Sequence, residues 1–187
     1  MKSPSLLAAA VTFAVLNPVL AQAQTWQVEP ADSHLTFEVS EGGRQLAGEF
    51  ETFTADIRFD PDDLANAAID VSIDTASAAT GTPDKDSTLP GSDWFYISKF
   101  PAARFTSTNV KHLGGNDYVA SGTLTIRDQT HPADLNFVLN IEGDRAHAVG
   151  STTIDRLDYG VGASVTNEAT LAHQVTVKVD LTATRAP

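Results

Sequence analysis

The stretch HQVTVKVDLTA, residues 173–183, decides the fold class of this chain. From Val175 to Ala183 every second side chain is apolar, and the residues between them are polar. Successive side chains of a β-strand point to opposite faces of the sheet, so a period of two indicates a strand with one buried and one solvated face. The stretch therefore predicts a strand whose apolar face packs on a protein interior.

The same period of two recurs along most of the chain. It is clear in five further segments and weaker in two, which gives eight expected strands. The further segments are residues 34–40, about 47–59, 68–74, 118–127 and 133–142, and the weaker ones are 103–111 and 146–155. Short glycine-containing links at 113–117 and 142–145 are typical of hairpins. No helical period is long enough to cross over a parallel sheet, so we expect an antiparallel sheet.

Eight antiparallel strands with one apolar face either close into a barrel or pair as a sandwich. The interior of an eight-stranded barrel is filled by side chains or holds one small ligand. We expect the segment 47–59 to form one unusually long strand, of about 40 Å at roughly 3.3 Å per residue. Such strands build a tall barrel, and its apolar interior suits a linear ligand better than a compact one.

The alternation stops over residues 75–102, a segment too long for a hairpin loop. Loops of this length are usually functional or carry structure of their own. We expect a short helix at 84–89, ended by Pro90-Gly91. The segment runs into an aromatic stretch, DWFYISKFPAARF at 93–105, which has five aromatic rings in 13 positions. These rings either plug the barrel as solid core or line a cavity, and the pattern alone favours the plug.

Residues 1–23 have the arrangement of a cleaved signal peptide. A basic start is followed by an apolar run over residues 6–16 and by small residues before a cleavage site after Ala23. The apolar run is well short of the ~20 residues that a transmembrane helix needs. We therefore expect an exported protein with a single domain over residues 24–187.

The chain is acidic and has no cysteine. It has 24 acidic and 12 basic residues, for a net charge of −12 at pH 7. This charge repels nucleic-acid phosphates and anionic lipid surfaces, so we expect no nucleic-acid partner. Without cysteine the chain forms no disulfide, thiolate metal site or cysteine nucleophile.

Catalytic and metal-binding motifs are missing from the sequence. There is no G-x-S-x-G nucleophile elbow, and the five scattered histidines show none of the zinc-binding spacings. We therefore expect no catalytic residue, no metal and no cofactor, and a protein that is not an enzyme.

Three charged residues are candidates for binding a polar head group: Arg127, Arg156 and Asp158. Arg156 and Asp158 are two positions apart, so their side chains would share a face of a strand. At a cavity mouth these residues would bind a quinone or a phosphate. The alternative is an exposed ion pair, which contributes little to stability.

Six blocks of the sequence occur in an order that is known from one protein family. They are WQVEPADSHLTFEV (26–39), LAGEFETFTADIRFDP (46–61), IDTASAATG (73–81), DKDSTLPGSDWFYISKFPAARFTST (84–108), YVASGTLTIRDQTHPADLNF (118–137) and DRLDYGVG (155–162). With these blocks the chain resembles the YceI-like proteins, a family described as polyisoprenoid-binding. Asp128 stands where the family usually has glycine, and Tyr96 stands where an acidic residue is common. Neither difference removes the fold assignment.

The resemblance implies an elongated lipocalin-like barrel with a short helical and aromatic insertion around 75–102. It also implies a long apolar cavity for an isoprenoid chain, which favours the cavity interpretation of the aromatic rings over the plug. The residues then expected to line the cavity are Phe37, Phe53, Trp94, Phe95, Phe100, Phe105, Ile126, Leu135 and Phe137.

Together, the pattern and the resemblance predict a periplasmic binding or carrier protein for a linear isoprenoid lipid, either a polyprenyl chain or an isoprenoid quinone. The alternative is a non-enzymatic interaction module with a filled barrel, acting on an exported or membrane redox partner such as a cytochrome b561-like domain. A lipid hydrolase is a third hypothesis, for which the sequence has no recognisable nucleophile or metal site.

Overall fold

The computed structural model describes residues 24–187, and the predicted signal peptide lies outside the described residues. The strands are β1 (Thr25–Val28), β2 (His34–Glu41), β3 (Arg44–Phe50), β4 (Phe53–Arg58), β5 (Ala68–Asp74), β6 (Ala78–Ala79), β7 (Ala102–Gly114), β8 (Asp117–Ile126), β9 (Gln129–Glu142), β10 (Arg145–Asp155) and β11 (Leu171–Arg185). The helices are the short α1 (Pro83–Asp86) and the 3₁₀ turns η1 (Pro30–Asp32), η2 (Leu64–Asn66) and η3 (Thr75–Ser77). None of the described helices has the length and apolar character needed to cross a membrane.

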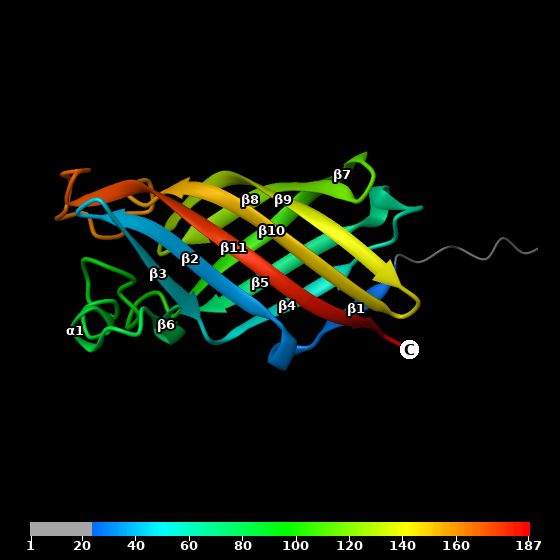
Figure 1. Cartoon of the computed structure of the whole chain (residues 1–187), viewed down its shortest axis with the longest axis horizontal. Coiled ribbons are helices and arrows are strands. Elements are labelled where there is room, and N and C mark those ends of the chain that lie inside the picture. Colours follow the sequence, from blue (N-terminus) through cyan, green and yellow to red (C-terminus); the bar gives the residue numbers. More distant parts are fainter. Residues whose placement is uncertain (1–23) are drawn as a thin grey trace, which may run out of the picture.

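Eight of the strands form a closed antiparallel barrel (Figure 1). Their order is β1-β4-β5-β7-β8-β9-β10-β11, and the pairing of β1 with β11 closes the ring. The other three strands continue the sheet beyond β11 in the order β2-β3-β6. The expected eight-stranded antiparallel barrel is confirmed, and the weaker candidates at 103–111 and 146–155 are the strands β7 and β10.

The barrel is elongated because three of its strands are long. β7, β9 and β11 contain 13, 14 and 15 residues. At about 3.3 Å per residue, β11 spans roughly 50 Å. The barrel is therefore longer along one axis than across it, as Figure 1 shows.

The segment 47–59, expected to be one long strand, is two strands with a break at Glu51 and Thr52. The two strands have different neighbours: β4 stays in the ring between β1 and β5, whereas β3 pairs with β2 and β6. At the break, the amide of Glu51 donates to the carbonyl of Ser77 (3.2 Å), and the amide of Thr52 donates to the Ser77 hydroxyl (3.0 Å). The expectation of a single strand was wrong because Ser77, which is distant in sequence, takes up the main-chain donors at this point.

The strands β1 and β2 act as one strand that η1 interrupts. β2 pairs with the first part of β11 and β1 pairs with its end. Between them, the Ser33 hydroxyl accepts a hydrogen bond from the amide of Thr182 (3.1 Å) and donates one to its carbonyl (3.2 Å). The buried Ser33 side chain thus takes part of the place of the main-chain pairing that η1 removes, so the amide of Thr182 keeps a hydrogen-bond partner.

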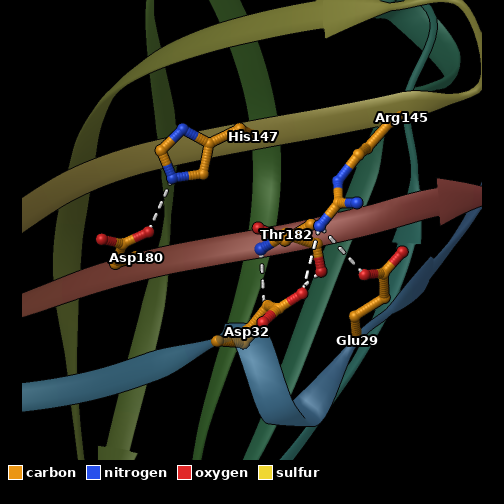
Figure 2. A network of polar contacts seen from close by, with 7 residues as sticks. Glu29, Asp32, Arg145, His147, Asp180 and Thr182 are labelled. Atoms are coloured by element: carbon orange, nitrogen blue, oxygen red, sulfur yellow. Dashed lines mark hydrogen bonds and ion pairs between the residues drawn. The ribbon is translucent and has the colours of Figure 1, made fainter.

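A polar network lies on the outer face beside this interruption (Figure 2). Arg145 on β10 reaches across β11 to Asp32 and Glu29, with N–O distances of 3.1 and 3.3 Å. His147 pairs with Asp180 on β11 at 2.7 Å. Each of these surface pairs contributes little energy. The two contacts of Arg145 tie η1 and the residue before it to β10, whereas the His147–Asp180 pair joins β10 to β11.

The insertion between β5 and β7 lies at one end of the barrel, beside β3 (Figure 1). Only two of its residues, in β6, pair with β3. The expected helix at 84–89 is present as the shorter α1, followed by turns through Pro90-Gly91. The insertion thus covers the edge of β3 that no long strand occupies.

Candidate ligand-binding cavity

The barrel is hollow. A cavity of about 390 Å³ lies inside it, within the usual range of ligand pockets. The inward-facing residues Val175, Val177 and Val179 of β11 line this cavity and are only partly buried, although they point to the interior. Side chains in a filled core would be fully enclosed. The interior therefore has room for a ligand.

A second, smaller cavity of about 80 Å³ continues the first along the barrel axis. On β11 the inward-facing residues from Leu171 to Val179 line the large cavity, and those from Val179 to Ala183 line the small one. The two cavities share four wall residues, Leu35, Val71, Leu135 and Val179. These four residues, here called the constriction, mark the boundary between a wide chamber and a narrow one.

Trp26 of β1 lines the narrow chamber at the end of the barrel where β1 pairs with the last residues of β11 and where the C-terminus lies (Figure 1). Trp26 is buried there, and its indole N–H donates to the carbonyl of Phe59 (2.9 Å). The guanidinium of Arg185 lies 5.1 Å from the centroid of the Trp26 ring. A large ring with its polar N–H satisfied makes a tight floor for an apolar chamber.

Aromatic rings gather at the other end of the interior. Trp94 and Phe95, from the insertion, and Phe105 of β7 line the wide chamber. The Phe95 ring lies edge-on to Phe50 at a centroid distance of 5.7 Å, and Phe50 lies 5.4 Å from Phe37. The insertion thus contributes to the chamber wall and does not fill its interior.

Eight of the nine predicted wall residues line at least one of the two chambers. Phe37, Trp94, Phe95, Phe105, Ile126 and Leu135 line the wide chamber, and Phe53, Leu135 and Phe137 line the narrow one. That they contact a ligand stays a prediction.

Phe100 is the exception among the predicted wall residues. Its ring packs edge-on against Tyr96 at 5.9 Å, outside both chambers. Its carbonyl accepts a hydrogen bond from the hydroxyl of Thr75 (2.9 Å). Phe100 therefore anchors the insertion to η3, because the turn through Tyr96 directs it away from the interior.

Arg156 lies in the wall of the wide chamber, but its donors are occupied. The guanidinium is 3 % exposed and donates to the main-chain carbonyls of Val161, Gly162, Val165, Leu171 and Ala172. An arginine has five N–H donors, so none remains for a head group. Burial lowers the pKa of Arg156 below its ordinary value, and the nearby carboxylates of Asp155 and Asp93 oppose this effect. Arg156 organises the turn after β10, which corrects its predicted role in head-group binding.

The other two head-group candidates do not join Arg156 at a mouth. β10 ends at Asp155, so Arg156 and Asp158 do not share the face of a strand as expected; Arg156 is buried and Asp158 is exposed. Arg127 donates to the carbonyls of Trp94 (3.3 Å) and Gly160. Arg127 therefore ties the aromatic insertion to the turn after β10.

Two charged residues that the sequence did not reveal as a site line the wide chamber together. Glu41 is the fourth inward-facing residue of β2, after Leu35, Phe37 and Val39. The Lys85 ammonium of α1 lies 2.5 Å from both Glu41 carboxylate oxygens. Continuing the alternation of β2 by one step would have revealed the inward direction of Glu41. No local pattern could have paired it with Lys85, because only the packing of the insertion brings them together.

Comparison with known proteins agrees with this architecture. Residues 26–183 match the model of the YceI-like domain. A UPF0312 protein of Shewanella baltica (strain OS185) is 31% identical over 165 residues, which cover 83% of this chain and 86% of that protein.

Solved structures show the same fold. Burkholderia cenocepacia BcnA superposes with a TM-score of 0.81 at 28% identity, covering 84% of this chain and 100% of that one. A polyisoprenoid binding domain from Saccharophagus degradans superposes with a TM-score of 0.66 at 18% identity, covering 88% and 99%. The matched domain spans the whole barrel and both chambers, and this chain therefore belongs to the YceI-like family.

Proposed function

We propose that this protein binds and carries a linear isoprenoid lipid, a polyprenyl chain or an isoprenoid quinone, in the periplasm after export. The observation that carries the proposal is the hollow, elongated interior, whose two chambers lie end to end and have apolar walls. The structural neighbour from Saccharophagus degradans, described as a polyisoprenoid binding domain, supports the ligand class. In this role the protein holds its ligand without making or breaking bonds.

The energetics favour a long chain. Burial of apolar chain contributes about 0.8 kcal/mol per CH₂ group, so about 20 carbons give roughly 16 kcal/mol before costs. Association itself costs about 4–15 kcal/mol. A short isoprenoid therefore binds weakly in such a barrel, and only a chain that fills the wide chamber binds tightly.

The alternative of an interaction module required a filled barrel, and the cavity of about 390 Å³ argues against that form of it. A membrane partner with a cytochrome b561-like domain stays a prediction. Such a partner would fit a carrier equally well, since a carried quinone has to be delivered to a protein in or on a membrane.

The test is organic extraction and mass spectrometry of the mature protein, purified without detergent from the periplasm of its own host. We expect a stoichiometric isoprenoid in the extract. The same protein, once delipidated, should take up added polyprenol or quinone at one molecule per barrel. An empty extract, together with no uptake of either lipid, would overturn the proposed function.

A further inference from the structure

The charged groups of the wide chamber are few. Four of its lining residues are acidic or basic: Glu41, Asp84, Lys85 and Arg156. Arg156 donates all its hydrogen bonds to carbonyls of its own turn. The groups left to meet a ligand are therefore two carboxylates and one ammonium.

These three groups lie at a mouth of the chamber. Asp84 lines the chamber and is exposed. The side chains of Lys85 and Glu41 line it as well and are 33% and 42% exposed. They stand at the opposite end of the interior from the Trp26 floor, where β2 ends and α1 packs. A lipid whose tail points to the floor would place its head group here.

The charge at this mouth disfavours an anion. The Lys85 ammonium is already neutralised by Glu41 at 2.5 Å, and Asp84 adds a second negative charge. A phosphate head group would bring about 1.5 to 2 further negative charges next to both carboxylates. An uncharged oxygen head group meets no such repulsion. Two of the three ammonium donors go to Glu41, which leaves one donor for a carbonyl or hydroxyl oxygen, and the carboxylate accepts from a hydroxyl.

We infer that Glu41 and Lys85 form a head-group site that selects an isoprenoid with an uncharged oxygen head group, a quinone, quinol or alcohol, over a polyprenyl phosphate. Glu41 excludes the phosphate and orients Lys85, and Lys85 donates to the ligand oxygen. The inference rests on the proposed function, because it takes the wide chamber to be the place of the lipid tail.

The chain offers a matched control on the same strand. Glu38 is an outward-facing residue of β2 and pairs with Lys178 of β11 at 2.6 Å. The two pairs have the same chemistry and nearly the same length, but only Glu41 and Lys85 line the chamber. Changes in overall charge or strand stability affect both pairs alike, whereas a head-group site depends on one.

The experiment is competition between a polyprenol and the polyprenyl monophosphate of equal chain length for the delipidated mature protein, read by mass spectrometry of the bound lipid. Because the ratio of the two lipids is measured within each variant, partial loss of folded protein cancels. We expect the wild type to prefer the polyprenol by at least about tenfold, and Glu41→Gln to shift the ratio toward the phosphate by about tenfold. Lys85→Met should weaken binding of the polyprenol several-fold, since one charge-assisted hydrogen bond is lost.

Glu38→Gln and Lys178→Met should leave the ratio and the affinity unchanged. The inference is overturned if the wild type prefers the phosphate, if Glu41→Gln leaves the ratio unchanged, or if Glu38→Gln shifts it equally. If both lipids bind but their ratio is the same in the wild type and in Glu41→Gln, the head-group site is disproved and the carrier function stands. If neither lipid binds, the head-group site and the carrier function are both disproved.

Discussion

Phe37 and Gly48 face each other across β2 and β3, and the Phe37 ring occupies the space that a side chain at position 48 would need. A Cβ atom on Gly48 would overlap that ring and lie 2.7 Å from the carbonyl oxygen of Ala79. The glycine lets the ring lie against Phe50 at 5.4 Å. This cross-strand pair therefore shapes the aromatic wall of the wide chamber.

Replacing this glycine should be costly. Gly48→Val forces Phe37 off its position and presses on the β6 backbone, so we expect the free energy of unfolding to fall by about 1–3 kcal/mol. The measurement is urea unfolding followed by tryptophan fluorescence. Ala47→Val, at the exposed neighbouring position, should change stability by no more than about 0.5 kcal/mol. Equal effects of the two changes would contradict the packing argument.

A charge on the aromatic wall should reduce lipid retention. Phe95→Asp places a carboxylate among Trp94, Phe50 and the lipid tail, and we expect at least a tenfold loss of affinity, about 1.4 kcal/mol. The barrel should stay folded, because Phe95 belongs to the insertion and not to a barrel strand. Retention is measured by extraction and mass spectrometry. Leu113→Asp, at a position that is 61% exposed on β7, serves as the control. Full retention by Phe95→Asp would count against the placement of the tail.

Opening the constriction should change which chain lengths bind. Leu135→Ala removes a side chain shared by both chambers, so longer tails should reach the narrow chamber. We expect the distribution of bound polyprenols, offered as a mixture, to shift toward longer chains, with a loss of stability of about 2 kcal/mol. Val138→Ala, on the outer face of β9, should leave the distribution as in the wild type. An unchanged distribution for Leu135→Ala would show that the narrow chamber does not receive the tail.

The turn after β10 should depend on the donors of Arg156 more than on its charge. Arg156→Met leaves five carbonyls without their donor, and we expect a loss of about 3 kcal/mol or more in the free energy of unfolding. Arg156→Lys keeps the charge but has three donors instead of five, so it should restore only part of that loss. Thermal and urea unfolding of the wild type, Arg156→Met and Arg156→Lys measures the order of their stabilities. Full restoration by lysine would assign the effect to charge.

The insertion should loosen only in acid. The Asp86 carboxylate accepts hydrogen bonds from the hydroxyl and amide of Thr80 at 2.6 and 2.7 Å, and these bonds lower the pKa of Asp86 below its ordinary value. A lowered folded-state pKa adds stability that is present above the unfolded pKa and is lost as the pH falls through the folded value. The difference in thermal stability between wild type and Asp86→Asn should therefore be constant from pH 7 to about pH 5 and shrink below the ordinary aspartate pKa of about 3.9. A difference that shrinks already near pH 6 would point to another group.

The alternation of apolar residues was sufficient to predict most of the barrel, because the direction of a strand side chain is a local property. The same property placed Phe37, Phe105, Ile126 and Leu135 correctly in the wall. It failed where the backbone leaves the strand conformation. Asp158 lies in a turn, and a turn sets the direction of a side chain through contacts that the period of two does not describe. Phe100 lies where the alternation has stopped, and only the family resemblance placed it in the wall.

The sequence by itself determined the all-β class, the antiparallel order of neighbouring strands and the place of the insertion, since each follows from patterns within a few residues. Only the tertiary structure decided the break between β3 and β4, because Ser77 causes it from a distance. Only the structure decided that the barrel is hollow, because free volume depends on side chains from all strands at once. Only the tertiary structure decided the pairing of Glu41 with Lys85 as well. The two residues are 44 positions apart, and packing of the insertion against the barrel brings them into contact.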